Sequence, residues 1–320
     1  MFDKIVDEFR AKIENHPYLG KMDTLNWLME FLMSKKIAVA VIHGMGNQKK
    51  KKPNGDPHQL HFSGKLWRKV RREIGAQQFE QDVIWREVFW ADVLSKREEA
   101  LLEANKNDMS TGIIRKFVLH NLGDAAAYRN TGKSDDATYV RIHRRVRNTL
   151  SGIRKDVGED IPLIVLAHSL GGHIMSNYIY DTCDKKQGPP SYRNDVVPNS
   201  DLENFRTLAA FVTFGCNIPI FTLAFPHKKV CPITYPGVNL PQEKRQMPWW
   251  INYHDRSDVL GFPLRNISPK YQAMAARNEL NDRNIDAGPI GISSSPLSHN
   301  FYWTDRDFYK PVAKLIGEYL

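Results

Sequence analysis

The chain has 320 residues, of which 42% are hydrophobic and 25% charged, so it can bury a large core without disulfides or metals. Its net charge of +9 would attract anionic surfaces, but no nucleic-acid-binding motif accompanies that charge, and we expect no nucleic-acid partner. Cys183, Cys216 and Cys231 fit no zinc or redox spacing, and there is no dinucleotide fingerprint. We therefore expect no metal, no cofactor, and a reducing, cytoplasmic location.

The first 36 residues are predicted to form a helical segment separate from the rest of the chain. Phe2, Ile5 and Phe9 recur at helical spacing, and Trp27 and Phe31 indicate a second, short helix. Acidic residues in the first turns and the lack of a long apolar run argue against a signal peptide.

Buried strands and helices alternate over residues 37–320, which we expect to form one α/β domain. Ile37–Ile42 is an unbroken apolar run rich in β-branched residues, which is typical of a strand inside a parallel sheet. The other strands are expected at residues 83–89, 162–167, 208–214 and 250–253, and the helices at 64–74, 91–105, 139–153 and 305–319. This alternation predicts a mostly parallel central sheet with helices on both faces.

Two segments are expected as cap insertions over a pocket, at residues 107–134 and 218–248. The apolar piece at residues 218–225 could line an acyl pocket, although such stretches more often belong to the core.

The uncharged stretch over residues 208–225 is long enough to raise the question of a transmembrane helix. Gly215, Asn217 and Pro219 interrupt it, so we expect a buried strand within it rather than a membrane-spanning helix.

The chemistry is expected at the turn between the most apolar strand and the helix after it. Ala167-His168-Ser169-Leu170-Gly171 fits the small-x-Ser-x-Gly pattern of a nucleophile elbow, with alanine at the first small position. This turn would lift the Ser169 hydroxyl above the sheet and aim the Leu170 N–H at the same point. An ordinary turn with an N-capping serine is the alternative.

A glycine-containing loop follows the first strand, in the order His43, Gly44, Met45 and Gly46. An acyl-transfer site needs two donors for the developing oxyanion, and glycines let a backbone bend close to the substrate. We expect the Met45 N–H to be the second donor, beside that of Leu170. A plain glycine turn ending a strand is the alternative.

The segments IHGMGNQ and VLAHSLGGH resemble those of α/β-hydrolases, in particular lipase and esterase branches with an AHSxGG elbow. The resemblance covers residues 37–320 and implies the α/β-hydrolase fold and the chain order serine, acid, histidine. It also implies a histidine base in a loop before the final helix. His299 lies in such a position, in preference to His173, His227 and His254.

The carboxylate that would orient this base is expected after the strand at residues 250–253. Asp255 and Asp258 both follow it, and Asp258-Val259 is similar to the acid-bearing loop of lipase relatives, although one residue of the usual spacing is missing. By that resemblance Asp258 is preferred over Asp255.

These residues predict a serine hydrolase that cleaves a carboxylic ester through an acyl-enzyme on Ser169, with His299 as base and Asp258 as acid. The expected substrate is a small-molecule or lipid ester with an apolar acyl group. An acyltransferase or thioesterase with the same residues, a peptidase or amidase, and a catalytically silent binding protein remain as alternatives. The lysine run at residues 49–52 could add weak contact with an anionic membrane surface, or be only a solvated loop.

Overall fold

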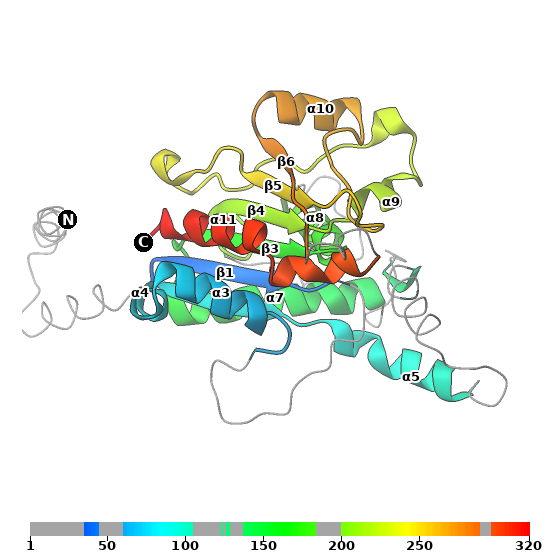
Figure 1. Ribbon diagram of the computed structural model, residues 1–320, viewed down its shortest axis with the longest axis horizontal. Helices are drawn as coiled ribbons and strands as arrows, with labels where there is room; N and C mark the ends of the chain where they lie inside the picture. The colour runs from blue at the N-terminus through cyan, green and yellow to red at the C-terminus, as the bar shows by residue number, and fades with distance from the viewer. Residues whose placement is uncertain are drawn as a thin grey trace, which may run out of the picture.

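The computed structural model describes residues 35–44, 60–104, 123, 126–128, 137–183, 200–288 and 296–320 (Figure 1). Residues 1–34 of the expected N-terminal helical segment lie outside the described residues. So do Met45, Gly46, the lysine run, and all but four residues of the first cap insertion. Almost all of the described residues therefore belong to the expected α/β domain.

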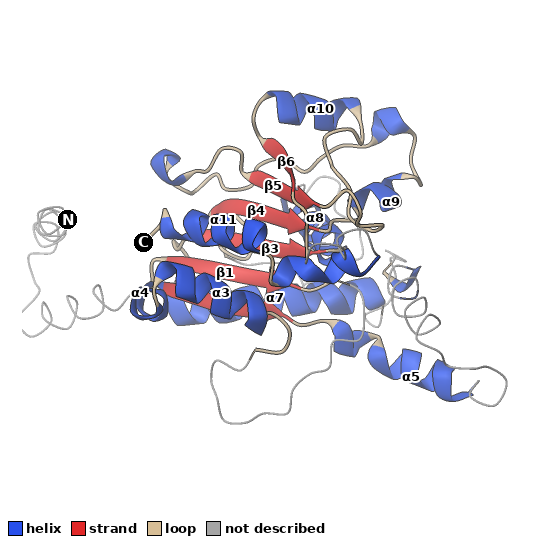
Figure 2. Ribbon diagram, in the orientation of Figure 1, coloured by secondary structure: helices blue, strands red, loops and turns tan. Residues whose placement is uncertain are grey.

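The centre of the molecule is a six-stranded sheet with the order β2-β1-β3-β4-β5-β6, in which every neighbouring pair is parallel (Figure 2). The strands are β1 (Ile37–Ile42), β2 (Val83–Val88), β3 (Leu163–His168), β4 (Leu208–Phe214), β5 (Trp250–His254) and β6 (Leu280–Asn284). The first five agree with the prediction to within one residue at each end. The predicted parallel sheet is thus confirmed.

Helices cover both faces of this sheet, as predicted (Figure 1). Alternate residues of β1 point to opposite faces, so that Ala38 and Ala40 contribute to one core and Val39 and Val41 to the other. The first core is closed by α7 (Thr138–Val157), α8 (Leu170–Cys183) and α10 (Pro269–Ala276), and the second by α3 (Gly64–Ile74), α4 (Ala76–Asp82) and α11 (Arg306–Gly317). Two buried faces explain why the central strands are apolar throughout rather than alternating.

The strand order contains a switch between β1 and β3. The chain leaves β1 toward β2 on one side and then returns to place β3 and β4 on the other. In open parallel sheets the loops at such a switch diverge and leave a crevice at the carboxyl ends of the strands. Gly44 and Ser169 follow the two strands at this point.

The sequence prediction missed β6, α4 and α10. β6 is an edge strand with the sequence LNDRN, in which only Leu280 is buried. It therefore carries no hydrophobic pattern from which a strand could be recognised. The predicted helix at residues 91–105 is divided into η1 (Ala91–Val93) and α5 (Ser95–Ala104).

The connection from β4 to β5 contains α9 (Ile218–Thr222), η2 (His227–Lys229) and η3 (Gln242–Lys244). It includes all of residues 218–248, the second expected cap insertion. α9 follows the carboxyl end of β4, whereas Tyr235 donates a hydrogen bond to the Leu208 carbonyl at the amino end of the same strand. Only the first part of the connection therefore lies at the carboxyl edge. Among the described helices, none is long and apolar enough to cross a membrane.

A half-buried carboxylate fixes the chain where it enters α3. Glu87, in β2, accepts hydrogen bonds of 2.6–3.1 Å from the backbone N–H groups of residues 61–63 and from the Ser63 hydroxyl. Trp85 in turn donates to the Ser63 hydroxyl. A single side chain thus satisfies the donors that precede the helix.

We predict that Glu87→Ala destabilises the fold by about 3 kcal/mol, because several half-buried donors lose their charged acceptor together. Glu80→Ala is the matched control, since Glu80 forms an exposed ion pair with Arg71 and should contribute less than about 1 kcal/mol. The free energy of unfolding in urea measures both. Equal losses in the two variants would contradict this account of Glu87.

Candidate active site

Ser169 lies in a tight turn between β3 and α8, at the carboxyl edge of the sheet. Its φ angle is +55°, in the left-handed region that non-glycine residues rarely adopt. The Ser169 N–H donates to the Phe214 carbonyl at the end of β4, and its own carbonyl accepts from Gly172, each at 3.0 Å. These bonds hold the strained turn between two strands and the first turn of the helix.

The turn can form only because the residues around Ser169 are small. A side chain on Gly44 would place its Cβ 2.9 Å from Ser169 Oγ, and one on Gly171 would lie 2.7 Å from the His43 carbonyl oxygen. Both distances are shorter than any real Cβ contact, so the loop after β1 and the start of α8 press directly on the turn. Gly44, which was expected to let its loop bend close to the substrate, lies directly against the serine.

Ser169, His299 and Asp258 form one chain of hydrogen bonds. His299 Nε2 lies 2.8 Å from Ser169 Oγ, and His299 Nδ1 lies 2.9 and 3.0 Å from the two oxygens of Asp258. A carboxylate can only accept, so Nδ1 carries the hydrogen and Nε2 presents its lone pair to the serine hydroxyl. All three residues are buried, and they come from three different connections.

His299 lies in the 3₁₀ helix η4 (Pro296–Trp303) rather than in the irregular loop expected from the sequence. One turn later in the same helix, Tyr302 donates its hydroxyl to Asp258 Oδ2 at 3.0 Å. The Leu260 N–H donates to Asp258 Oδ1 at 2.9 Å. The short helix therefore brings both the histidine and a second donor to the carboxylate, a role of Tyr302 that no sequence signal indicated.

The pKa of Asp258 is lowered despite its burial. Burial alone would raise it, but the hydrogen bond and charge of His299 and the hydrogen bonds from Leu260 and Tyr302 outweigh that effect. Gly261 and Gly215 lie against the carboxylate, and a Cβ on either would come within 3.2 Å of its atoms. Asp258 is thus a charged group enclosed by donors and by backbone.

Asp255, the alternative acid, has other partners. Its oxygens accept from the N–H groups of Ser257 at 2.6 Å and Ala287 at 2.7 Å, and its own N–H donates to the Tyr302 hydroxyl. It therefore fixes the loops on either side, and none of its described hydrogen bonds joins it to His299.

The other histidines after Ser169 lie elsewhere. His173 is in α8 and stacks on Phe221 with ring centroids 4.0 Å apart, and burial lowers its pKa to about 3. His227 is exposed in η2, and His254 ends β5 with its pKa lowered by burial.

His168, immediately before the serine, was not expected to take part. Its Nε2 lies 2.8 Å from the carbonyl oxygen of His299, and a carbonyl only accepts, so this nitrogen donates. Burial and the nearby His299 lower the pKa of His168 to about 3, which leaves the ring neutral. The side chain thus ties the backbone of η4 to the end of β3.

His43 fixes the loop after β1. Its Nδ1 lies 2.8 Å from the Gly44 carbonyl oxygen, and its Nε2 accepts from the Trp90 N–H at 3.2 Å. The rings of His43 and Trp90 stack at 4.8 Å, and burial lowers the pKa of His43 to about 4. Phe62 and Phe89 pack against the same ring. The Gly44 carbonyl is thereby held by a neutral histidine whose ring is surrounded by aromatic side chains.

Leu170 is the first residue of α8, and the first N–H groups of a helix have no partner within it. Its N–H therefore belongs to the positive end of the helix that begins directly after Ser169. The other expected donor, Met45, lies outside the described residues, as does Gly46.

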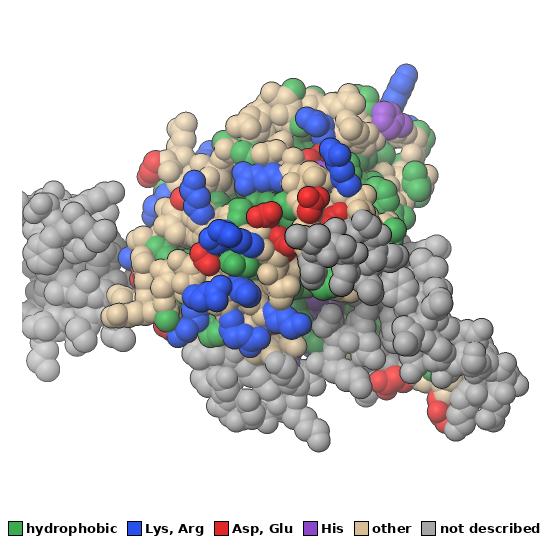
Figure 3. Space-filling view, in the orientation of Figure 1, with side chains coloured by type: hydrophobic (Ala, Val, Ile, Leu, Met, Phe, Trp, Pro, Cys, Tyr) green, Lys and Arg blue, Asp and Glu red, His purple; other side chains and the backbone are tan. Residues whose placement is uncertain are grey.

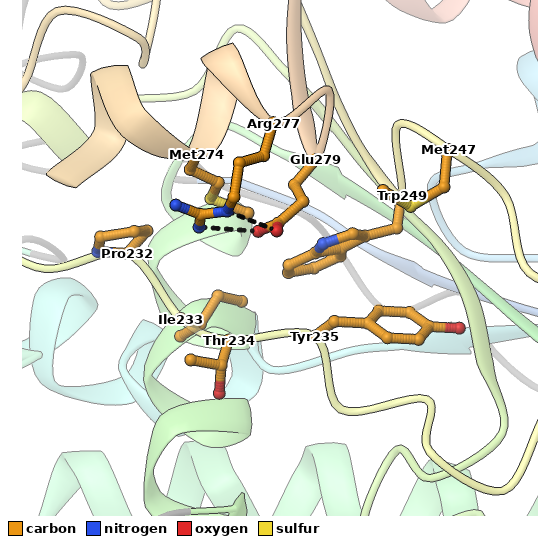
Figure 4. Close-up of a pocket in the computed structure, with 9 residues that line it drawn as sticks. All are labelled: Pro232, Ile233, Thr234, Tyr235, Met247, Trp249, Met274, Arg277 and Glu279. Atoms are coloured by element: carbon orange, nitrogen blue, oxygen red, sulfur yellow. Dashed lines mark hydrogen bonds and ion pairs between the residues drawn. The ribbon is translucent and has the colours of Figure 1, made fainter.

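A cavity of about 340 Å³ opens at the opposite edge of the sheet (Figure 4). Trp249 and Glu279, which line it, directly precede β5 and β6, so the cavity lies at the amino ends of these strands. It shares no residue with the Ser169 site. Within the described ranges, no three His, Cys, Asp or Glu side chains are grouped so that they could hold a metal ion.

The strand order, the helices on both faces and the strand–serine–helix turn are those of an α/β-hydrolase fold. No protein-family model matches the sequence, and no curated protein is detectably similar to it. Among solved structures, an acetyl ester-xyloside bifunctional hydrolase from Caldicellulosiruptor lactoaceticus is similar over 89% of this chain and 84% of its own, with 14% identity and a TM-score of 0.36. Similarity at this level leaves the function to be argued from the site.

We predict that acid destabilises the fold through its buried neutral histidines. Burial lowers the pKa of His43 to about 4, and those of His143 and His168 to about 3. In the unfolded chain they protonate near pH 6.5, so below that pH the unfolded state binds more protons and stability is lost. Each histidine should cost about 2 kcal/mol at pH 5 relative to pH 7.

Urea unfolding measured from about pH 7 to about pH 5 tests this, with His143→Gln as the variant. The slope of unfolding free energy against pH should be smaller in that variant by about 1.4 kcal/mol per pH unit. His227→Gln, at an exposed position, should leave the slope unchanged. An unaltered slope in His143→Gln would show that this histidine does not carry the effect.

Proposed function

We propose that this protein is a serine hydrolase that cleaves a carboxylic ester through an acyl-enzyme on Ser169. The observation that supports this most directly is the hydrogen-bonded chain from Ser169 Oγ through His299 to Asp258. Such a chain is what activates a serine hydroxyl, which is a weak nucleophile by itself. The left-handed φ of Ser169 adds support, because an N-capping serine in an ordinary turn needs no such strain.

In the proposed reaction Ser169 Oγ attacks the ester carbonyl while His299 Nε2 takes the hydroxyl proton. That proton then passes to the departing alcohol, and the serine carries the acyl group. Water attacks the acyl-enzyme with His299 again as base, which releases the acid and restores the serine. Asp258 keeps the hydrogen on Nδ1 and stabilises the positive charge that His299 acquires.

The oxyanion formed in each step would be stabilised by the N–H groups of Leu170 and Met45. The position of Leu170 at the start of α8 supports its part, and for Met45 the support is its place in the sequence directly after Gly44. Each such donor would lower the barrier by about 3 kcal/mol.

We further propose that the substrate is an ester with an apolar acyl group. Partly buried aromatic side chains beside the site support this choice. Phe62 and Phe89 pack on His43, and Trp303 packs on His168 and Phe62. Each methylene that finds such surroundings contributes about 0.8 kcal/mol, so affinity should rise steeply with chain length.

The first test combines both points. The protein should hydrolyse p-nitrophenyl esters with kcat/KM rising about fifteenfold per added pair of methylenes while the pocket can bury them, as about 0.8 kcal/mol for each predicts. A fluorophosphonate probe should label it, and Ser169→Ala should abolish labelling and turnover while leaving the thermal transition in place. Equal labelling of wild type and Ser169→Ala would overturn the assignment, and a flat chain-length profile would remove the apolar acyl group from it.

The second test separates the two acids. Asp258→Asn should lower kcat by about four orders of magnitude, because His299 then adopts the wrong tautomer, and His299→Ala should lose a similar amount. Asp255→Asn should reduce thermal stability, since two backbone donors lose a charged acceptor, and alter kcat far less. A larger loss of kcat in Asp255→Asn than in Asp258→Asn would reverse the assignment of the acid.

A further inference from the structure

Large hydrophobic side chains are exposed on two connections beside Ser169. Ile220, in α9, is 40% exposed, and Leu223 and Phe225, which follow it, are 84% and 64% exposed. Val259, next to Asp258, is 56% exposed. The described residues expose eight large hydrophobic side chains in all, and six of them lie on these two connections, with Val238 and Met247 as the other two. The sequence analysis had favoured the core for residues 218–225, and for Ile220, Leu223 and Phe225 the structure shows the opposite.

The two connections are joined at the carboxyl edge of the sheet. The Phe262 N–H donates to the Cys216 carbonyl at 2.9 Å, just before α9 begins. Phe221 stacks on His173 of α8 with the rings 5° from parallel, and Ile218 and Val230 are buried. The exposed residues therefore lie on a segment that packs against α8, the helix that follows Ser169.

The exposed apolar residues are bordered by positive charge. Lys228 and Lys229 are both exposed in η2, which begins two residues after Phe225. There is no Asp or Glu between Glu203 and Glu243. Figure 3 shows hydrophobic side chains along the right-hand edge of the molecule, where α9 lies in Figure 1, with a histidine and a basic side chain above them. Apolar side chains next to cations, without anions, match the acyl and headgroup layers of an anionic lipid surface.

We propose that residues 220–229 form a docking surface for an anionic phospholipid membrane. Ile220, Leu223 and Phe225 enter the boundary between headgroups and acyl chains, while Lys228 and Lys229 contact the phosphates. A protein partner would need matching acidic groups around a small protruding apolar patch, whereas a lipid surface provides anions at every position. The docking stands on exposure and charge alone, and only its relation to Ser169 rests on the proposed function.

The first experiment measures flotation of the full chain with vesicles of phosphatidylcholine, with and without phosphatidylserine. The wild-type chain should bind the anionic vesicles, and Leu223→Ser/Phe225→Ser should bind them about tenfold more weakly or worse, since two large apolar groups no longer leave water. Leu101→Ser/Val238→Ser makes the same kind of change at exposed positions outside the patch and should bind like wild type. Equal binding by the two double variants would overturn the proposal.

The second experiment addresses the charges. Lys228→Gln/Lys229→Gln should weaken binding to the anionic vesicles by roughly fivefold per lysine, and Lys155→Gln/Lys314→Gln, at exposed positions elsewhere, by far less. Raising the salt from about 0.1 M to about 1 M should weaken wild-type binding. Binding of the same strength to vesicles without phosphatidylserine would also overturn the proposal.

A control separates this inference from the proposed reaction. Ser169→Ala should float with anionic vesicles as well as wild type does, whether or not the protein hydrolyses esters. Loss of ester turnover without loss of flotation in that variant supports a docking surface distinct from the reacting groups. Loss of flotation in Ser169→Ala would overturn it.

Discussion

Close packing at the carboxyl ends of β1, β3 and β4 is the constraint on which the site depends. Gly44 and Gly171 leave no room for a side chain beside Ser169, and Gly215 and Gly261 leave none beside Asp258. Because the backbone itself forms the walls, the serine and the carboxylate are fixed by main-chain atoms rather than by side chains that can rotate. The left-handed φ of Ser169 is the cost of that closeness, and the sheet on one side and α8 on the other maintain it.

The second feature is that one short helix completes the site. η4 supplies His299, and its Tyr302 donates to Asp258, so a displacement of this helix would move His299 and remove a donor from Asp258 together. His168 holds the same helix through the carbonyl of His299. The carboxylate that contacts His299 is buried and surrounded by donors, while the histidines at positions 43 and 168 remain neutral. A neutral surrounding of this kind leaves the Asp258 charge free to act on His299.

The same edge of the sheet differs from the rest of the surface. Aromatic side chains pack around His43 and His168, and residues 220–225 present apolar side chains to solvent next to exposed lysines. The proposed substrate class and the proposed docking surface thus rest on separate residues, and either can fail without the other.

Sequence alone determined the buried strands, most of the helices, and the turn that carries Ser169, because apolar runs with two buried faces and a small-x-Ser-x-Gly turn are local signals. It also singled out His299 and preferred Asp258, but only by resemblance and chain order. Tertiary structure decided the hydrogen-bond partners and the exposures that arise only when segments distant in the sequence come together. It brought Asp258 rather than Asp255 within hydrogen-bonding distance of His299, added Tyr302 and His168 as their partners, and left Ile220, Leu223 and Phe225 exposed instead of buried. Contacts between residues as much as 131 positions apart leave no periodic trace in the sequence, and neither does a polar edge strand such as β6.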